Sequence, residues 1–355
     1  MKRRIRIFYE VFADEENVNA QSLNARGIAL NLDPERFEST FLVNRKADPR
    51  LIEKSHMRLI RLPPRMSSLF VKLYLLWARN DILVYPNELF HTPLFSRLLN
   101  GRRKWVYPLE MPIDFVKEEN PRMFRHLCRI LKKSDCVVPI TSHTARVLKQ
   151  ETGIKASTII PLGIDTHFFS PVERPPSSKV RILFAGRLIE RKGPDKVLDA
   201  AQSFPDATFR MIGSAYGKED GVFADQLRHR VREDRLNNVE FIGKVSQKEL
   251  RQFLWDSDIL FHPSRVEGIP RVTLEAGATG LPSIVLDSYQ TPSVVDGVTG
   301  FQVKSVDEMF DRLRVLIVNR DLRLQMGAAA VAHVKQFDWG VLAKRWEEVF
   351  AELVS

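Results

Sequence analysis

The sequence has few cysteines and no long apolar run. Cys128 and Cys136 are the only cysteines among 355 residues, which argues against a disulfide-stapled scaffold and against a cysteine-based zinc site. No stretch reaches the roughly 20 consecutive apolar residues of a membrane-spanning helix. No signal peptide precedes the first expected strand. We therefore expect a cytoplasmic protein.

Motifs of several other protein classes are missing as well. There is no GxGxxG fingerprint of the kind that dehydrogenases use for dinucleotides. Zinc-finger and RNP-type patterns of nucleic-acid-binding proteins are also absent. We identify no DxD or histidine-cluster signature of a metal site. These absences predict chemistry without a metal or an organic cofactor.

The excess of positive charge lies in one half of the chain. The protein carries 54 Lys and Arg against 44 Asp and Glu, a net charge of +10. Residues 1–170 hold 28 cationic and 18 acidic residues, whereas residues 171–355 hold 26 of each. A one-sided basic surface attracts membrane headgroups, a lipid pyrophosphate or nucleic acid. A scattered excess that only aids solubility stays an open alternative.

Strand and helix patterns alternate along both halves. The first half opens with the apolar strand IRIFYEVF, an amphipathic helix and the strand FESTFLV. The second half runs from VRILFAG through ATFRMIGSA to DILFHPS. Such alternation is typical of doubly wound parallel sheets, where ligands gather at the carboxyl ends of the strands. The length allows two domains, and the Pro- and Ser-rich segment VERPPSSK is the expected linker.

Two helix starts can be placed from the sequence. Ser246 followed by Glu249 predicts a capping box, in which each side chain accepts from the other residue's backbone N–H. Ser142, after the strand pattern SDCVVPIT, predicts an N-cap for the helix HTARVLKQETG.

Two carboxylates stand eight positions apart in the segment FHPSRVEGIPRVTLEAGATGLP. They are Glu267 and Glu275, and Gly268 with Pro270 predicts a turn that leads into a helix. The first N–H groups of such a helix have no partner inside it, so its start attracts anions and hydroxyl oxygens. The pattern favours a site for a phosphorylated sugar, whereas two solvated glutamates on a helix are the plain alternative.

A short basic loop follows the first strand of the second half. In GRLIERKG, Arg187 and Lys192 stand between Gly186 and Gly193. Arginine grips phosphate with two N–H groups and lysine acts as a compact point charge. Fixed cations stabilise the charge that grows on a departing diphosphate. The loop therefore predicts a diphosphate clamp, against the alternative of a solvated Arg-Lys loop.

These segments resemble the E-x7-E and GRL-x3-KG regions of retaining glycosyltransferases with the GT-B fold, in particular family 4, the glycosyl transferases group 1. STIIPLGIDTHFF further resembles the family's IPNGVDxxxF segment. The resemblance implies an α/β GT-B fold of two Rossmann-like domains facing across a cleft. Residues 1–170 would bind the acceptor and residues 171–335 the nucleotide-sugar. Residues 336–355 would form a helix that crosses back to the first domain, seated by Phe337 and Trp339.

The resemblance also implies a metal-independent, retaining hexosyltransferase. Arg187 and Lys192 would hold the donor diphosphate, Glu267 the sugar and Glu275 the ribose. A UDP-sugar is favoured slightly over a GDP-sugar, and the acceptor is expected to be a glycan or a lipid-linked sugar of cell-envelope or exopolysaccharide synthesis. The remaining donor-binding positions carried over from the family are Gly186, Gly213, Ile242, Gly268, Ile269, Arg271 and Val272.

The first half departs from the family pattern. The family's Gly-Gly pair in the first loop is replaced by Asn17 to Ala20, and Leu162 stands where the IPNG segment has Asn. Relatives often carry a histidine near the donor sugar in the loop that here reads YPLEMPID. Glu110 is the ionisable residue at that place, and we assign it a sugar or acceptor hydroxyl, with an ordinary loop carboxylate as the alternative. The lone His91 is expected to be structural.

The most amphipathic basic stretch runs from Leu62 to Asn80. Apolar residues recur there at helical spacing, flanked by Arg65, Lys72 and Arg79. The corresponding region often touches membrane or acceptor in the family. The pattern therefore predicts peripheral binding to the inner face of the plasma membrane, or else a helix docked on its own sheet.

Three other hypotheses stay open. A sugar-nucleotide epimerase of GT-B shape would need more acid and base groups. A basic nucleic-acid-binding protein lacks interleaved aromatics here. A non-catalytic relative that only binds would be expected to have lost charged residues of the E-x7-E and GRL-x3-KG motifs. All four are present in this chain: Arg187, Lys192, Glu267 and Glu275.

Overall fold

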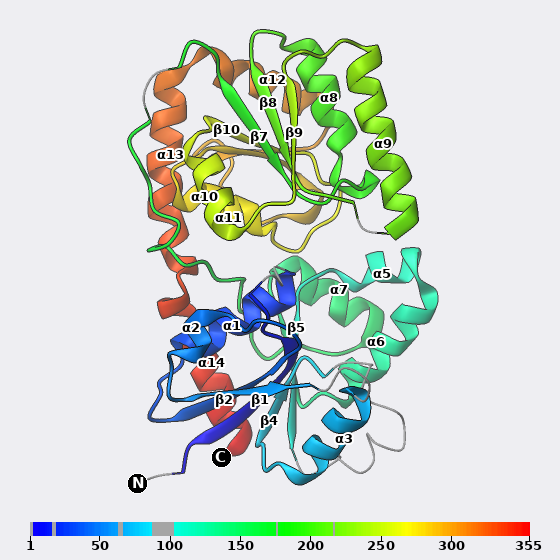
Figure 1. Ribbon diagram of the computed structural model, residues 1–355, viewed down its shortest axis with the longest axis vertical. Helices are drawn as coiled ribbons and strands as arrows, with labels where there is room; N and C mark the ends of the chain where they lie inside the picture. Colours follow the sequence, from blue (N-terminus) through cyan, green and yellow to red (C-terminus); the bar gives the residue numbers. More distant parts are fainter. Residues whose placement is uncertain (1–2, 16–18, 63–66, 87–102, 175–176, 216) are drawn as a thin grey trace. The chain divides into compact units, whose positions relative to one another are not determined.

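The computed structural model describes residues 3–15, 19–62, 67–86, 103–174, 177–215 and 217–355 (Figure 1). The chain divides into two compact units. The first unit is Met1–Gly163 together with Phe337–Ser355, and the second is Ile164–Gln336. The sequence places the two boundaries after residues 170 and 335, and the structure divides the chain at 163/164 and 336/337. The binding role predicted for each unit stays a prediction.

The first unit is a parallel six-stranded sheet in the order β3-β2-β1-β4-β5-β6. Its strands are β1 (Ile5–Phe12), β2 (Phe37–Val43), β3 (Met57–Arg61), β4 (Ile82–Val84), β5 (Lys104–Leu109) and β6 (Cys136–Pro139). Its helices are α1 (Ala20–Asn31), α2 (Pro49–Ile52), α3 (Ser67–Trp77), α5 (Ile113–Glu119), α6 (Pro121–Lys133), α7 (Ser142–Thr152) and α14 (Trp339–Val354).

The second unit repeats this topology. Its order, β12-β11-β10-β7-β8-β9, is the same strand sequence traced from the other edge. The strands are β7 (Arg181–Ala185), β8 (Thr208–Ile212), β9 (Val239–Gly243), β10 (Ile259–His262), β11 (Ser283–Leu286) and β12 (Gly300–Val303). The helices are α8 (Pro194–Ser203), α9 (Gly217–Glu233), α10 (Gln247–Trp255), α11 (Arg271–Ala278), α12 (Val306–Val318) and α13 (Arg320–Val334). The prediction of two doubly wound α/β domains is confirmed.

Of the two predicted helix starts, one agrees with the structure and the other is displaced by one residue. Ser246 and Glu249 form the full capping box at the start of α10, as predicted. The helix α7 begins at Ser142, and its N-cap is Thr141, whose side chain accepts from the Thr144 N–H at 3.0 Å. The sequence assignment of Ser142 as the cap was therefore wrong by one residue, because Thr141 offers an equally good hydroxyl one position earlier.

The C-terminal helix α14 completes the core of the first unit. It lies beside α1, in red and blue in Figure 1. Trp339 fills a slot between two glycines: a Cβ built at Gly27 or at Gly163 would come within 2.1 or 2.4 Å of the indole. The side chains of Trp346 and Phe350 are buried against the same core. The return of this helix to the first unit depends on those contacts.

The opposite face of the first sheet carries α3 and α6. Along β5, Val106 points into the core under α1 and α14, so Trp105 and Leu109 point the other way. Trp105 packs with the α3 residues and Leu109 packs with the α6 residues. No helix among the described residues is both long and apolar enough to cross a membrane.

Candidate donor site

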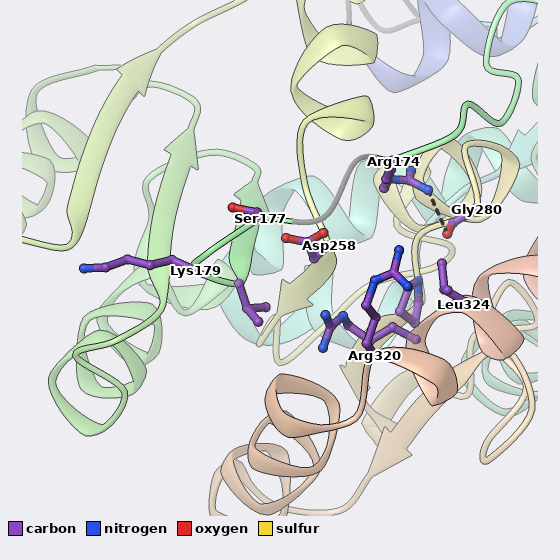
Figure 2. Close-up of a pocket in the computed structure, with 10 residues that line it drawn as sticks. Arg174, Ser177, Lys179, Asp258, Gly280, Arg320 and Leu324 are labelled. Atoms are coloured by element: carbon purple, nitrogen blue, oxygen red, sulfur yellow. Dashed lines mark hydrogen bonds between the residues drawn. The ribbon is translucent and has the colours of Figure 1, made fainter.

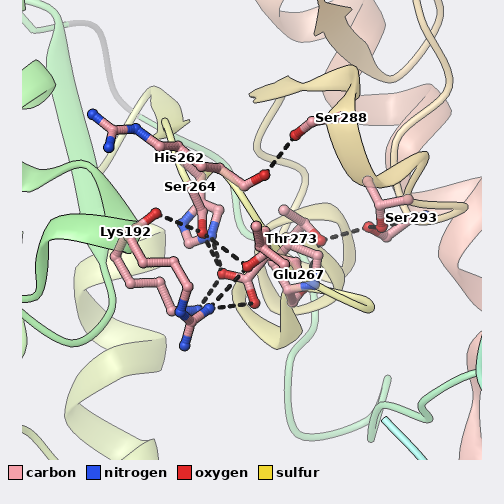
Figure 3. Close-up of polar contacts among 12 residues, drawn as sticks. Lys192, His262, Ser264, Glu267, Thr273, Ser288 and Ser293 are labelled. Carbon is pink, nitrogen blue, oxygen red and sulfur yellow. Dashed lines mark hydrogen bonds and ion pairs between the residues drawn. The ribbon is translucent and has the colours of Figure 1, made fainter. Parts of the chain in front are cut away.

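The candidate site lies at the carboxyl ends of β7 and β10, which are neighbours in the second sheet. The loop after β7 carries a 3₁₀ turn, Glu190–Lys192, and the loop after β10 runs from Pro263 to Pro270 into α11. Figure 3 shows that Lys192 and Glu267 meet from these two loops. The Lys192 ammonium donates to Glu267 Oε1 in a buried ion pair. The sequence names both residues, but it assigns them to different parts of a ligand and does not predict their contact.

Glu267 is held by further donors. Ser264 Oγ donates to Glu267 Oε1 at 2.6 Å, and His262 Nε2 lies 3.4 Å from the same oxygen. Burial alone would raise the pKa of Glu267, but the Lys192 charge and the hydrogen bonds outweigh it and hold the pKa well below its usual range. Glu267 is therefore a fixed carboxylate at neutral pH.

The supporting residues His262 and Ser264 received no role from the sequence. Both are buried, and burial lowers the pKa of His262, so its imidazole is neutral. A neutral imidazole that donates through Nε2 leaves Nδ1 as an acceptor, and Nδ1 is buried with no hydrogen-bond partner among the described residues. The signal was present in the spacing, because HPS precedes Glu267 by three to five positions.

Glu275 stands inside α11, in its second turn, and is buried. Its Oε1 accepts no hydrogen bond from the part of the chain that the structure describes. Burial raises the pKa of Glu275 to about 7, against the opposing effects of Arg271 and Gln247. An inward carboxyl with an unused oxygen is suited to accept a hydroxyl donor from a ligand.

The start of α11 has no side-chain cap, and its Thr273 N–H donates to the Pro270 carbonyl at 3.0 Å. Pro270 occupies the N-cap position and no side chain caps the helix there. Ile269 and Val272 flank this start and are buried. Thr273 is occupied elsewhere, since its hydroxyl donates to the Pro270 carbonyl at 2.6 Å and contacts Ser293 Oγ at 2.5 Å. The N–H groups of the first turn thus remain the anion-attracting feature of the loop.

Arg187 lies at the edge of this cluster. Its guanidinium donates to Asp220 at 2.6 Å on α9 and is half exposed. Its charge still contributes to lowering the pKa of Lys192, after burial and the nearer Arg191. In this structure Arg187 therefore pairs with Asp220, while Lys192 and, at 3.9 Å, Arg191 are the cations that face Glu267.

Two glycines shape the loops, each for a steric reason. Gly213 follows β8 with φ +139°, and a Cβ there would come within 1.8 Å of the Gly186 carbonyl oxygen. Gly193 has φ +68°, and a Cβ there would meet the Pro263 carbonyl at 2.5 Å. Both positions let neighbouring backbones approach closely. Ile242 lies on β9, at the far edge of the same sheet.

Glu110 belongs to a separate polar cluster in the first unit. It follows β5 and accepts from Tyr85 Oη at 2.5 Å and from Asn24 Nδ2 at 3.1 Å. The first-loop residue Asn19 caps α1 by accepting from the Ser22 N–H at 2.8 Å. Asn17 and His91 lie outside the described residues. The role of Glu110 toward a hydroxyl stays a prediction.

Contrary to the expectation from its motifs, the sequence does contain one string of the form DxD. Asp256 to Asp258 precede β10, at the amino ends of the strands, and Asp258 is paired with Arg181 there. Among the described residues, no group of three or more His, Cys, Asp or Glu is placed to hold a metal ion.

Two Rossmann-like units of this topology, the second with a cationic loop facing an E-x7-E helix, have the architecture of the GT-B fold. Residues 165–333 match the family model "Glycosyl transferases group 1". That segment, just under half of the chain, is similar to this family.

Curated relatives match part of the chain. It is 30% identical over 251 residues to the GDP-mannose-dependent monoacylated alpha-(1-6)-phosphatidylinositol monomannoside mannosyltransferase of Corynebacterium glutamicum, covering 63% of this chain and 64% of that protein. It is 29% identical over 257 residues to the D-inositol 3-phosphate glycosyltransferase of Corynebacterium aurimucosum, covering 65% and 60%. The matches thus span less than two thirds of either relative.

Solved structures match the whole chain in fold. Sucrose-phosphate synthase from Thermosynechococcus elongatus has a TM-score of 0.84 at 19% identity, with 99% of each chain covered. Anabaena Alr3699/HepE in complex with UDP and glucose has a TM-score of 0.80 at 18% identity, covering 98% of this chain and 100% of that one. The predicted GT-B fold is confirmed.

Proposed function

We propose that the protein is a retaining glycosyltransferase that moves a sugar from a nucleotide-sugar to an acceptor hydroxyl. The observation that carries this is the pairing of Lys192 with Glu267 beside the uncapped start of α11, with the unused Oε1 of Glu275 in the same helix. The family match supports the class of activity.

Each group has one task in this proposal. Lys192 and the N–H groups of the first turn of α11 stabilise the diphosphate, whose negative charge grows as its bond to the sugar breaks. Glu267 is fixed as a carboxylate and accepts from sugar hydroxyls. Glu275 accepts from the ribose. Arg187 joins the diphosphate when a ligand draws its guanidinium from Asp220.

The reaction exchanges two bonds at the anomeric carbon. The bond from that carbon to the diphosphate oxygen breaks, and the nucleoside diphosphate leaves with the electron pair. The acceptor oxygen forms the new bond on the same face, and its proton passes to the departing phosphate. This route uses no protein nucleophile and no metal, because the cation and the helix start supply the positive charge.

The donor test compares nucleotides and variants. We expect UDP to bind more tightly than GDP or ADP in calorimetry, in line with the preference inferred from the sequence. Two relatives carry GDP-mannose in their names, so tighter binding of GDP would reverse that preference.

The variant Glu275→Gln is expected to weaken binding of the preferred nucleotide-sugar about tenfold or more, because a carboxylate accepts more strongly than an amide. The exposed Glu240→Gln is the matched control.

The metal test uses turnover. Transfer or slow donor hydrolysis is expected to continue in EDTA at an unchanged rate. Complete loss of both activities in EDTA, with recovery on adding Mn²⁺, would overturn the metal-free route.

We further propose that the first unit rests on an anionic membrane that carries a lipid-linked acceptor. Four large apolar side chains of α3 are exposed, and Trp77 is 88% exposed. The α6 helix shares that face of the sheet and carries an exposed basic stripe at helical spacing, without an ion pair to any described residue. An apolar patch beside cations fits an anionic bilayer. The apolar residues are Leu69, Phe70, Leu73 and Trp77, and the stripe is Arg122, Arg125, Arg129, Lys132 and Lys133.

A further inference from the structure

A cavity lies at the amino ends of the strands of the second sheet, at the opposite edge from the candidate donor site. Lys179 precedes β7, Asp258 precedes β10 and Pro282 precedes β11, and all three line it. The cavity, called here the basal cavity, has a volume of about 60 Å³ (Figure 2). That is several times the space one water needs, roughly 10–15 Å³ by the same kind of measure. Its lining is completed by Arg174, Ser177, Val180, Gly280, Arg320, Arg323 and Leu324.

Positive charge dominates this lining. Four of its residues are cations, and Asp258 is its only acid. That carboxylate is already committed, since Arg181 donates to it through Nε and Nη2 at 3.0 Å each and through its backbone N–H at 2.8 Å. The basal cavity therefore has a net positive charge, which Asp258, already paired with Arg181, offsets only in part.

The two partly buried arginines of the lining, Arg174 and Arg323, donate to backbone carbonyls, which are uncharged. Arg174 donates to the carbonyls of Thr279 at 2.6 Å and Gly280 at 3.2 Å, at the end of α11, and its buried Nε has no hydrogen-bond partner among the described residues. Arg323 donates to the carbonyls that end α12. Burial lowers the pKa of Arg174 to about 10. Burial and the nearby Arg320 lower the pKa of Arg323. Carbonyl partners hold these side chains in place without supplying a counter-charge.

The two exposed cations of the lining, Lys179 and Arg320, make no polar contact with a described residue, neither a hydrogen bond nor an ion pair. Arg320 is also the first residue of α13. A cation at a helix start is disfavoured by the partial positive charge of the unpaired N–H groups. Asp321, the next residue, places a carboxylate in the same turn, so the start of α13 carries charges of both signs.

We infer that the basal cavity binds a small phosphate-type oxyanion, either free phosphate or the phosphate group of a small metabolite. Guanidinium groups present N–H donors in the planar geometry that phosphate oxygens accept, and the volume suits one such group. This site is separate from the proposed donor site and does not depend on the proposed function.

The test titrates inorganic phosphate into the full-length protein at low ionic strength by calorimetry. Wild type is expected to bind phosphate, Arg320→Gln to bind it roughly tenfold or more weakly, and the double variant Lys179→Gln, Arg320→Gln to lose it, since tenfold corresponds to one charge-assisted contact. Arg314→Gln, an exposed arginine of α12 outside the lining, is the matched control and is expected to bind as wild type does.

A donor-site variant separates the two anion sites. Lys192→Gln is expected to keep phosphate binding, and Arg320→Gln is expected to keep UDP binding. Equal phosphate affinity in wild type and the double variant, or loss in Lys192→Gln alone, would overturn the inference. So would equal responses to phosphate and to chloride at matched ionic strength, because that pattern is simple screening.

Thermal melting checks that the variants are folded. In phosphate-free buffer, Arg320→Gln is expected to melt at or above the wild-type Tm, because it removes a cation from the start of α13. Phosphate is expected to raise the Tm of wild type by roughly 2–5 °C and not that of the double variant. Tighter binding of glycerol 3-phosphate than of phosphate would identify a phosphorylated metabolite as the ligand. The reverse order would identify free phosphate.

Discussion

The two units share one strand topology, and each contains a buried ion pair, but the two pairs have different surroundings. In the first unit, Arg26 pairs with Asp48 at 2.7 Å with both side chains almost fully buried. Asp48 also caps α2 and accepts from Arg50. In the second unit, Lys192 pairs with Glu267 beside an uncapped helix start. A buried ion pair thus indicates a site only when open donors and acceptors surround it.

The largest effect is expected from breaking the pair of the first unit. Asp48→Ala leaves the Arg26 charge buried without its partner, which should lower the free energy of unfolding by about 3–5 kcal/mol. Arg50→Ala removes only the half-exposed partner and should cost about 1 kcal/mol or less. Urea denaturation measures both. If Asp48→Ala also weakened UDP binding by the folded protein, the division of roles between the two pairs would be wrong.

Breaking the pair of the second unit is expected to affect catalysis first. Lys192→Ala should lower turnover about 10²–10³-fold, because it removes a cation aimed at the developing diphosphate charge. Lys196→Ala, which removes a partly exposed side chain of α8 that pairs with Asp199, should leave turnover within about twofold of wild type. Initial rates with the preferred donor decide this. A Lys192→Ala enzyme with wild-type turnover would contradict the site assignment.

A smaller effect concerns pH and Glu275. The pKa of this carboxyl is about 7 in the folded protein, above the ordinary value of the unfolded chain. Between those two values the folded state keeps a proton that the unfolded state loses, so the free energy of unfolding falls as pH rises through this window. The loss should be about 2–3 kcal/mol. Glu275→Gln should abolish it.

Urea titrations of wild type and Glu275→Gln at pH 5 and pH 7.5 measure that difference. Other titrating groups cancel between the two proteins. Equal pH dependence in both would show that Glu275 is already ionised in the folded state.

The smallest effect on stability is expected on α3. Trp77→Ser removes an exposed side chain and should change the free energy of unfolding by no more than about 0.5 kcal/mol. It should nevertheless weaken co-sedimentation with vesicles that contain phosphatidylserine. The exposed Val318→Ser on α12 is the control. Equal sedimentation of wild type and Trp77→Ser would leave the α3 surface without a membrane role.

The sequence predicts the second unit more fully than the first. Its strands β7, β8 and β10 end at Ala185, Ile212 and His262, next to the motifs that the sequence shows. The chemistry of loops and caps depends on residues that are neighbours in the sequence. The contact between Lys192 and Glu267 is a different matter, because it joins residues 75 positions apart. Local patterns carry no information on which of two loops a side chain will meet.

Long-range packing escapes sequence reasoning for the same reason. The alternation of apolar residues identifies α14 as a helix, but the slot for Trp339 depends on the absence of side chains at Gly27 and Gly163. The basal cavity gathers Lys179, Asp258 and Arg320 from three distant segments. Only the register of the parallel strands brings those segments to one edge of the sheet.

The place of α14 has a consequence for the order in which the protein is made. Ile164–Gln336 is one uninterrupted stretch, whereas the first unit needs Phe337–Ser355 as well. During synthesis, the surface that later receives Trp346 and Phe350 emerges from the ribosome more than a hundred residues ahead of them. The nascent chain therefore exposes an apolar surface until Phe337–Ser355 has been synthesised, and that surface is a natural target for chaperones.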